Sequence, residues 1–298
     1  MKVVWGQDMD FITHGGGAQL SDRAHFLKGV KRGHDLSILT PNSDITMEDL
    51  MRCEVLIASN PLFMNITSFK EIMGHNIPYI WFFHDYAPLC KYRLFYPMRD
   101  TCKLCYLKER WLPVFLKSRL IIWLSPLHRE SWLYICPELE DIRYHLAPSP
   151  VNVELFSDLG LERKGAISVE SLHPFKGREH VIKWANDHQE VDITFVSGNP
   201  LPEEPLPPNC KVMGAVPYRA MNELYNKHEM FLHLPQSPSP FDRCVVEAYL
   251  AGCKVIGNEL IGALSYSWFK SRRDVSIECS SSSTFFWEAV EDAMGIKS

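Results

Sequence analysis

Lys176 is the side chain of this sequence best suited to binding an anion. It stands in Phe175-Lys176-Gly177, after a predicted strand and directly before a predicted helix. A cation beside the free amide groups of a helix N-terminus can bind a diphosphate. The alternative is an ordinary solvated Lys at a turn.

Glu247 is a second candidate, because it is a carboxylate among the apolar residues of a predicted helix. A Ser- and Pro-rich loop over residues 236–241 precedes this helix. A carboxylate embedded in an apolar helix needs a polar partner. The hydroxyls of a ribose would supply one, and an ion pair with an Arg is the structural alternative.

Two stretches of the first half could also bind a ligand. The glycines Gly15 to Gly17 stand between a predicted strand and a predicted helix, so their backbone N–H groups could approach a phosphate or a sugar. This is not the GxGxxG pattern of a dinucleotide site, and a flexible loop is the alternative. His84 and Asp85 end a very apolar predicted strand, where polar side chains of a parallel sheet face a ligand site. A structural His is the alternative at that position.

Three cysteines predict a structural zinc ion. Cys102 and Cys105 have the spacing of zinc ligands, and Cys90 is close in sequence. A closed site needs a fourth ligand, for which the candidates are His75, His84 and Cys136. Reduced free thiols are the alternative, because the chain has 9 cysteines and no expected secretion signal.

Short strands alternate with amphipathic helices along the chain, which is the βαβ pattern of an α/β fold. In the first half the expected strands are Val3–Gly6, Leu36–Thr40, Val55–Ser59, Pro78–Phe83 and Leu120–Ser125, and the expected helices are Gly17–Arg32, Phe63–Gly74 and Pro126–Ile135. In the second half the expected strands are Ala166–Glu170, Asp192–Ser197, Lys211–Met213, Met230–Leu234 and Lys254–Asn258, and the expected helices are Arg178–Asn186, Tyr218–Asn226 and Asp242–Ala251.

A Pro-rich segment over residues 145–152 interrupts this alternation and predicts a domain junction. We therefore expect an N-terminal Rossmann-like domain over residues 1–148 and a C-terminal one over residues 149–281. The run Ser280–Ser283 predicts a loop and an N-cap, followed by a final amphipathic helix over residues 282–294.

The composition excludes several classes of protein. Hydrophobic residues make up 46% and charged residues 22% of the chain, which is typical of a globular protein with a substantial core. The net charge of -5 gives no general reason to expect a polyanionic partner. The sequence contains no apolar run long enough to span a bilayer. We expect a cytoplasmic protein, either free or peripheral to a membrane through the tract Lys103–Lys117, for which a solvated helix face is the alternative.

Together these segments resemble the family-four (group 1) retaining glycosyltransferases, which have the GT-B fold of two Rossmann-like doubly wound domains facing across a cleft. The resemblance runs through nearly the whole chain. It rests on the glycine loop with the later Lys31-Arg32-Gly33-His34, on the motif His84-Asp85, on Ser125–Glu130 and Pro148–Phe156, on Glu170–Gly177, which is similar to "GRLxxxKG", and on Ser239–Ala248, which is similar to "EPFGxxxxEA".

The resemblance implies transfer of a sugar from a nucleoside-diphosphate sugar, such as a UDP- or GDP-sugar, to a hydroxyl acceptor with retention of configuration. No metal or other cofactor is expected for catalysis, because cationic side chains and helix dipoles can stabilise the leaving diphosphate. It implies three catalytic residues, namely Lys176 at the departing phosphates, Glu247 at the ribose and His84 near the reacting carbon. The implied donor-binding set is Gly16, Gly17, Ser171, Lys176, Gly177, Pro238, Ser239, Phe241 and Glu247. The resemblance also implies that residues 282–298 pack back on the first domain, with Phe285, Phe286, Trp287 and Val290 as the apolar face.

Two departures from the resembled motifs keep other functions open. Ser171 stands where the family usually has an Arg that supports the diphosphate, and Ser239 where it has a Glu that contacts the transferred sugar. One alternative is therefore a weakened GT-B protein that binds a nucleotide sugar or a glycan without transfer. Another is a sugar-nucleotide epimerase of the same architecture. The acceptor is open among glycans, lipid-linked sugars, proteins, small molecules and modified nucleic-acid bases.

Overall fold

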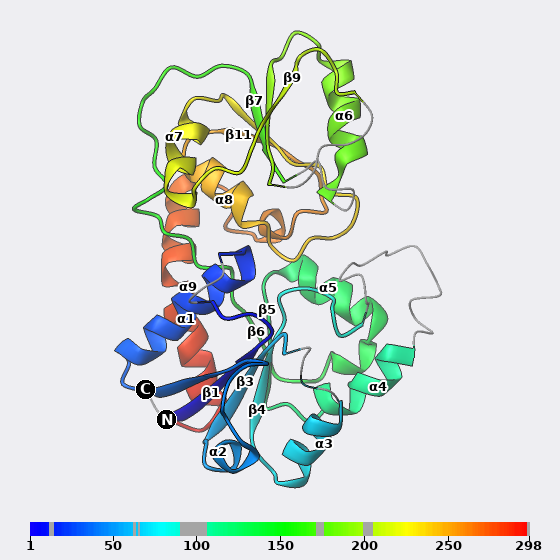
Figure 1. The fold of residues 1–298 in the computed structure, drawn as a ribbon, viewed down its shortest axis with the longest axis vertical. Helices are drawn as coiled ribbons and strands as arrows, with labels where there is room; N and C mark the ends of the chain where they lie inside the picture. The colour runs from blue at the N-terminus through cyan, green and yellow to red at the C-terminus, as the bar shows by residue number, and fades with distance from the viewer. Residues whose placement is uncertain are drawn as a thin grey trace. The chain divides into compact units, whose positions relative to one another are not determined.

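The structure is a computed structural model that describes residues 1–11, 15–61, 64, 66–89, 106–170, 176–198 and 205–296. The chain forms two compact units (Figure 1). The first consists of Met1–Pro150 together with Ser281–Ser298, and the second is Val151–Ser280. Both units are α/β, and every strand pairing among the described residues is parallel.

The first unit contains a six-stranded sheet in the order β2-β1-β3-β4-β5-β6. Its central strands are fully buried apolar runs, as expected for a parallel sheet that helices cover on both faces. The strands are β1 (Lys2–Gln7), β2 (Asp35–Leu39), β3 (Val55–Ser59), β4 (Tyr79–Phe82), β5 (Leu120–Trp123) and β6 (Tyr144–Leu146). The helices are α1 (Gly17–Lys31), α2 (Met47–Met51), α3 (Ile66–Gly74), α4 (Tyr106–Phe115) and α5 (Pro126–Ile135), followed by a short 3-10 turn η2 (Pro137–Leu139).

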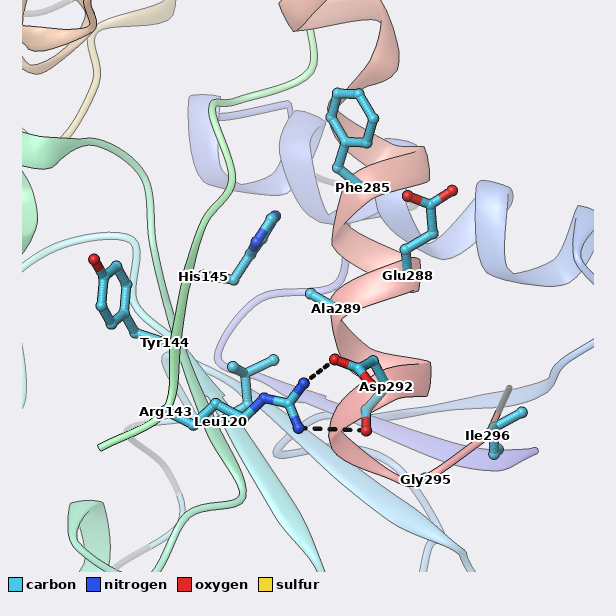
Figure 2. Close-up of a pocket in the computed structure, with 10 residues that line it drawn as sticks. All are labelled: Leu120, Arg143, Tyr144, His145, Phe285, Glu288, Ala289, Asp292, Gly295 and Ile296. Atoms are coloured by element: carbon cyan, nitrogen blue, oxygen red, sulfur yellow. Dashed lines mark hydrogen bonds and ion pairs between the residues drawn. The ribbon is translucent and has the colours of Figure 1, made fainter. Parts of the chain in front are cut away.

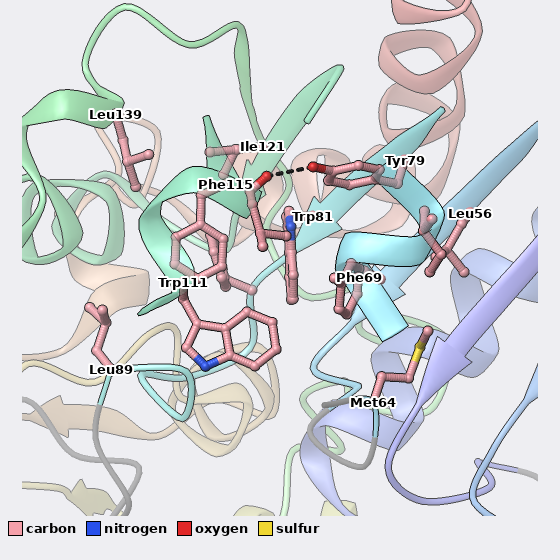
Figure 3. Packing of buried hydrophobic residues seen from close by; sticks show 14 of the residues in the cluster. Leu56, Met64, Phe69, Tyr79, Trp81, Leu89, Trp111, Phe115, Ile121 and Leu139 are labelled. Carbon is pink, nitrogen blue, oxygen red and sulfur yellow. Dashed lines mark hydrogen bonds between the residues drawn. The ribbon is translucent and has the colours of Figure 1, made fainter. Parts of the chain in front are cut away.

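An aromatic cluster forms much of the core of the first unit (Figure 3). The ring of Phe69 on α3 stacks against Trp81 on β4, with 5.0 Å between centroids. Trp111 on α4 meets Trp81 edge-on at 5.9 Å. The hydroxyl group of Tyr79 donates a hydrogen bond of 2.7 Å to the carbonyl of Val114, so this buried polar atom has a partner. The cluster thus fixes α3 and α4 against β4.

The second unit contains a five-stranded sheet in the order β11-β10-β7-β8-β9. Its core is smaller and is built mainly around Ile193, Phe195 and Leu232. The strands are β7 (Ala166–Val169), β8 (Ile193–Val196), β9 (Cys210–Met213), β10 (Met230–Leu232) and β11 (Lys254–Ile256), and the helices are α6 (Arg178–Asp187), α7 (Met221–Asn226) and α8 (Arg243–Leu250), with 3-10 turns η4 (Tyr218–Ala220) and η5 (Gly262–Ser265).

Helix α9 (Arg272–Ala293) corrects the prediction of a loop at Ser280–Ser283, because it continues through this run. The serine hydroxyls find partners without ending the helix. The hydroxyl of Ser280 donates to the carbonyl of Ile277 at 3.0 Å, and the hydroxyl of Ser282 donates to the carbonyl of Pro148. A serine run predicts a cap only where these hydroxyl groups bond to free backbone amides, and here they bond to carbonyls.

The part of α9 that belongs to the first unit packs closely against α1. The indole N–H of Trp287 donates to the carbonyl of His25 at 2.7 Å. A Cβ atom at Gly29 would lie 2.2 Å from the Trp287 ring, so only glycine fits beneath this indole. Phe286 is buried and stacks on Trp5, with 5.6 Å between ring centroids. Phe285 was expected on the same apolar face, but it is 42% exposed and faces the other side of the helix.

Candidate functional site

Lys176 and Gly177 lie at the start of α6, directly after the region that follows β7. Gly177 is the N-cap of this helix and has a φ of 89°. A Cβ atom at Gly177 would lie 1.8 Å from the carbonyl oxygen of Leu234, so a larger residue cannot fit. The N-terminus of α6 therefore packs against the chain that follows β10. This contact brings Lys176 close to the loop that leads into α8.

Asp242 is the buried anion next to Lys176. Its Oδ1 atom lies 3.7 Å from the Lys176 ammonium nitrogen, and its Oδ2 atom lies 3.2 Å from Nε2 of His233. The Ser239 hydroxyl donates a hydrogen bond to the same carboxylate. Burial alone would raise the pKa of Asp242, but His233, Lys176 and Ser239 outweigh it and lower this pKa. The attraction of Asp242 in turn raises the pKa of Lys176, although burial opposes this.

Glu247 is buried on α8 and has partners within the second unit. Its Oε1 atom accepts a hydrogen bond of 2.9 Å from the hydroxyl of Tyr218, and Nη2 of Arg243 lies 3.5 Å away. Burial raises the pKa of Glu247, while Arg243 and Tyr218 partly oppose this shift. The ion pair with an Arg, which the sequence left as the structural alternative, is therefore present. A role at a ribose stays a prediction.

The predicted donor-binding residues of the loop before α8 are Pro238, Ser239 and Phe241. Pro238 and Phe241 are buried, and Phe241 meets the ring of Tyr266 edge-on at 6.4 Å. The backbone N–H of Ser239 donates to the carbonyl of Leu260 at 2.8 Å, and its hydroxyl group also contacts that carbonyl at 3.0 Å. The Ser239 side chain is thus engaged with protein atoms. These hydrogen bonds tie the loop to Leu260 and to Asp242 at the start of α8.

His84 is the centre of a buried cluster in the first unit, at the carboxyl ends of β1, β3 and β4. Its Nε2 atom lies 2.8 Å from Oδ1 of Asp22 on α1 and 2.9 Å from the hydroxyl of Ser59. The Ser59 hydroxyl donates to both oxygens of Asp22, at 2.8 and 2.9 Å. Because Asp22 and Ser59 meet the same ring nitrogen, this is not the relay geometry of a Ser-His-Asp triad. The arrangement fixes the orientation of the His84 ring.

A second histidine, His128 on α5, lies near this cluster and is structural. Its Nε2 atom accepts a hydrogen bond of 3.0 Å from the indole of Trp132, and the N–H of Leu124 lies 3.3 Å from Nδ1. Burial, with a contribution from His84, lowers the pKa of His128 to about 3. His128 is therefore neutral at ordinary pH and is part of the buried packing around Trp132.

The glycine loop ends at the N-terminus of α1. Gly16 is the N-cap, with a φ of -72°, and Gly17 is the first helical residue. A Cβ atom at Gly15 would meet nothing within 4 Å, and one at Gly16 would meet only the flexible side chain of Gln19. The backbone therefore leaves space beside the free amide groups of α1. A ligand contact there stays a prediction.

Four predicted site residues lie outside the described residues, namely Ser171 of the donor set and the cysteines Cys90, Cys102 and Cys105. The zinc ion thus stays a prediction. Within the part of the chain that the structure describes, no group of three His, Cys, Asp or Glu side chains could hold a metal ion. No helix of that part is long and apolar enough to cross a membrane.

The acidic members of both clusters, Asp22 and Asp242, were not among the predicted site residues. Asp22 could have been found, because it follows the glycine loop on the first predicted helix. Asp242 could have been found as well, because it stands where the resembled motif "EPFG" has its glycine. Its φ of 64° is the left-handed conformation that this glycine would adopt easily. His233 and Ser59 gave no pattern of their own.

A groove of about 890 Å³ lies elsewhere in the first unit, between β6 and the end of α9 (Figure 2). The Arg143 guanidinium donates to the side chain of Asp292 and to its carbonyl, the latter at 3.3 Å. The exposed ring of Phe285 belongs to the same wall. None of the predicted site residues lines this groove.

Comparison with solved structures shows the fold class. HepE from Anabaena, solved with UDP, is 14% identical over 99% of this chain and 92% of its own, with a TM-score of 0.61. An alpha-glucosyltransferase, solved with UDP and a 13-mer DNA containing a HMU base, is 10% identical over 99% of both chains, with a TM-score of 0.61. AviGT4, a glycosyltransferase involved in avilamycin A biosynthesis, is 13% identical over 98% of this chain and 94% of its own, with a TM-score of 0.54.

These neighbours are GT-B glycosyltransferases, and this chain has the GT-B fold. The likeness covers nearly the whole chain and includes both Rossmann-like units. No protein-family model matches the sequence, and no curated protein is similar enough in sequence to show a relationship.

Proposed function

We propose that this protein is a glycosyltransferase that takes its sugar from a UDP-sugar and transfers it to a hydroxyl group with retention of configuration. The observation that carries the proposal is the half-exposed Lys176 side chain at the N-terminus of α6. It combines a side-chain cation with free helix amides, which is the chemistry that stabilises a leaving diphosphate.

Two further observations support this assignment. The whole-chain neighbours HepE and the alpha-glucosyltransferase were both solved with UDP, which favours UDP over other nucleotides as the leaving group. Glu247 is buried close to Tyr218. Its hydrogen bonds with Tyr218 and Arg243 both end on Oε1 and not on Oε2. In this proposal Oε2 accepts from a ribose hydroxyl. His84, held by Asp22, lies near the transferred sugar.

The acceptor can be identified by assaying transfer to a panel of hydroxyl compounds. The alpha-glucosyltransferase was solved with DNA that contains a HMU base, so modified DNA belongs in the panel beside glycans and lipid-linked sugars. A thermal-shift screen of UDP-, GDP-, ADP- and TDP-sugars comes first, and NMR of the product then gives its anomeric configuration. Stabilisation by UDP-sugars and a product of retained configuration would support the proposal. A chain that binds none of the four donors would contradict it.

A second candidate function is nucleotide-sugar binding without transfer. It is favoured by Ser239, whose hydroxyl is engaged with Asp242 and with the Leu260 carbonyl, so that it is not presented to a sugar. Tight binding of a UDP-sugar without consumption by any acceptor or by water would favour this candidate. Formation of an epimer would instead identify an epimerase.

A further inference from the structure

Asp242 occupies a backbone conformation that its residue type adopts rarely. Its φ and ψ are 64° and 74°, a left-handed geometry at the residue that opens α8. The resembled motif has glycine at this place, and glycine would adopt the conformation without strain. A strained residue persists when its surroundings hold it, and such residues cluster at functional sites. Asp242 is therefore a candidate for a functional role.

The two carboxylate oxygens of Asp242 have different partners. The carboxylate is 4% exposed, whereas the Lys176 side chain is 49% exposed. Ser239 and His233 contact Oδ2. The other oxygen, Oδ1, lies 3.7 Å from the Lys176 ammonium nitrogen. The carboxylate is thus fixed by buried partners on one side and contacts a cation that reaches solvent on the other.

We propose that Asp242 is a positioning residue for Lys176, whose ammonium group it holds at the start of α6. Both residues of the ion pair belong to the second unit, so the ion pair does not depend on the proposed function. Only the statement that Lys176 faces the donor phosphates rests on the proposed function. In that setting Asp242 does not touch the substrate. It acts through Lys176, which must be a cation when negative charge grows on the leaving diphosphate.

The electrostatic surroundings of Lys176 agree with this role. Among the described residues, the groups that act on it are Asp242 and Cys244 from the start of α8 and Glu170 from the end of β7. Burial raises the pKa of the Cys244 thiol, so Cys244 is neutral. Glu170 is the weaker of the two carboxylate influences, and its Oε1 atom accepts the N–H of Gly198 at 3.0 Å. The charge of Asp242 makes the largest contribution to the raised pKa of Lys176.

The test substitutes Asp242→Asn, because asparagine keeps the shape and tolerates the left-handed conformation while it removes the charge. Trace acetylation with acetic anhydride, read by mass spectrometry across pH, measures when the Lys176 amine loses its proton. We expect the midpoint for Lys176 to fall by about one pH unit or more in the variant, because an opposite charge at this distance shifts a pKa by that amount. The exposed Lys254 should label identically in both proteins. An unchanged Lys176 midpoint would overturn the proposal.

Binding of UDP, measured by calorimetry, gives the second readout. In Asp242→Asn the affinity should decline at a lower pH than in the wild type, and the substitution should have no effect in a Lys176→Ala background. An equal effect in both backgrounds would show that Asp242 does not act through Lys176. If UDP does not bind at all, the proposed function fails while the labelling experiment still tests the ion pair. Asp242→Gly, which adopts the same φ, replaces the asparagine variant if that one does not fold.

Discussion

The polar clusters around His84 and around Lys176 follow strands of different sheets and differ in exposure. Both lie at the carboxyl ends of parallel strands, where ligands of α/β proteins bind. Asp22, Ser59 and His84 are all buried and contact one another through the Ser59 hydroxyl, the Asp22 carboxylate and Nε2 of His84. The second cluster buries its anion, Asp242, and leaves its cation half exposed. The first arrangement fixes a ring in place, and the second leaves a cationic side chain accessible to solvent.

Lys176→Ala gives the largest expected effect, and it should act on turnover. Removal of a preorganised group that stabilises developing charge costs about 3–4 kcal/mol, on the order of a hundredfold or more in kcat. Donor binding should weaken less, because the charge on the diphosphate grows in the transition state. Steady-state kinetics with an accepted UDP-sugar measures both effects.

The matched control for this variant is Lys183→Ala. Lys183 lies on α6, the helix that begins just after Lys176, is exposed, and pairs with Asp187 at 2.7 Å. Its loss should leave kcat unchanged. Equal activity of Lys176→Ala and Lys183→Ala would remove Lys176 from the site.

Asp22→Ala should act on stability, because it leaves Ser59 and His84 buried without their shared acceptor. A buried polar group that loses its partner costs about 1–3 kcal/mol of unfolding free energy. Urea denaturation measures this loss, with Asp44→Ala, an exposed Asp of the same unit, as the control. A loss no greater than that of the control would contradict a closed cluster.

Gly29→Ala separates structural damage in the first unit from damage to its polar cluster. The added Cβ would press on the Trp287 ring, and overpacking of this kind costs about 1–3 kcal/mol. Gly74→Ala, where a Cβ meets nothing within 4 Å, should be close to neutral. The folded Gly29→Ala protein should keep its turnover. A large fall in the turnover of the folded Gly29→Ala protein would contradict a purely structural role for this contact between α1 and α9.

Glu247→Gln gives the smallest effect, and its sign depends on pH. The folded-state pKa of Glu247 is raised above the ordinary value of 4.5. The stability linked to its protonated form is therefore fully present below pH 4.5 and is lost as pH rises through the folded pKa. Compared with Glu247→Gln, the wild type should lose stability as the pH rises above 4.5 and through the raised folded-state pKa, as urea denaturation at a series of pH values would show. The exposed Glu229→Gln control should show no such trend, and a difference that stays constant with pH would argue against a buried Glu247 charge.

Most elements of both sheets could be predicted from the sequence, because buried parallel strands such as Val55–Ser59 are continuous apolar runs with distinctive ends. The positions of Lys176, Gly177 and His84 at element ends followed from the same alternation. Strand β6 was missed, because two of its three residues, His145 and Leu146, fall within the Pro-rich stretch assigned to the junction. Helix α9 was begun ten residues too late, at position 282 instead of 272, because Ser280–Ser283 has the composition of a loop.

The sequence by itself determined the fold class and the types of residue that end the strands, because local periodicity and turn chemistry encode both. Only the tertiary structure decided which partners these residues meet. The pairs Asp22 with His84, Lys176 with Asp242 and Gly29 with Trp287 are separated by 62, 66 and 258 positions, and no local pattern links such distant residues. Their proximity results from the order of strands in each sheet and from the packing of helices against it. This order is a property of the whole chain and not of any segment.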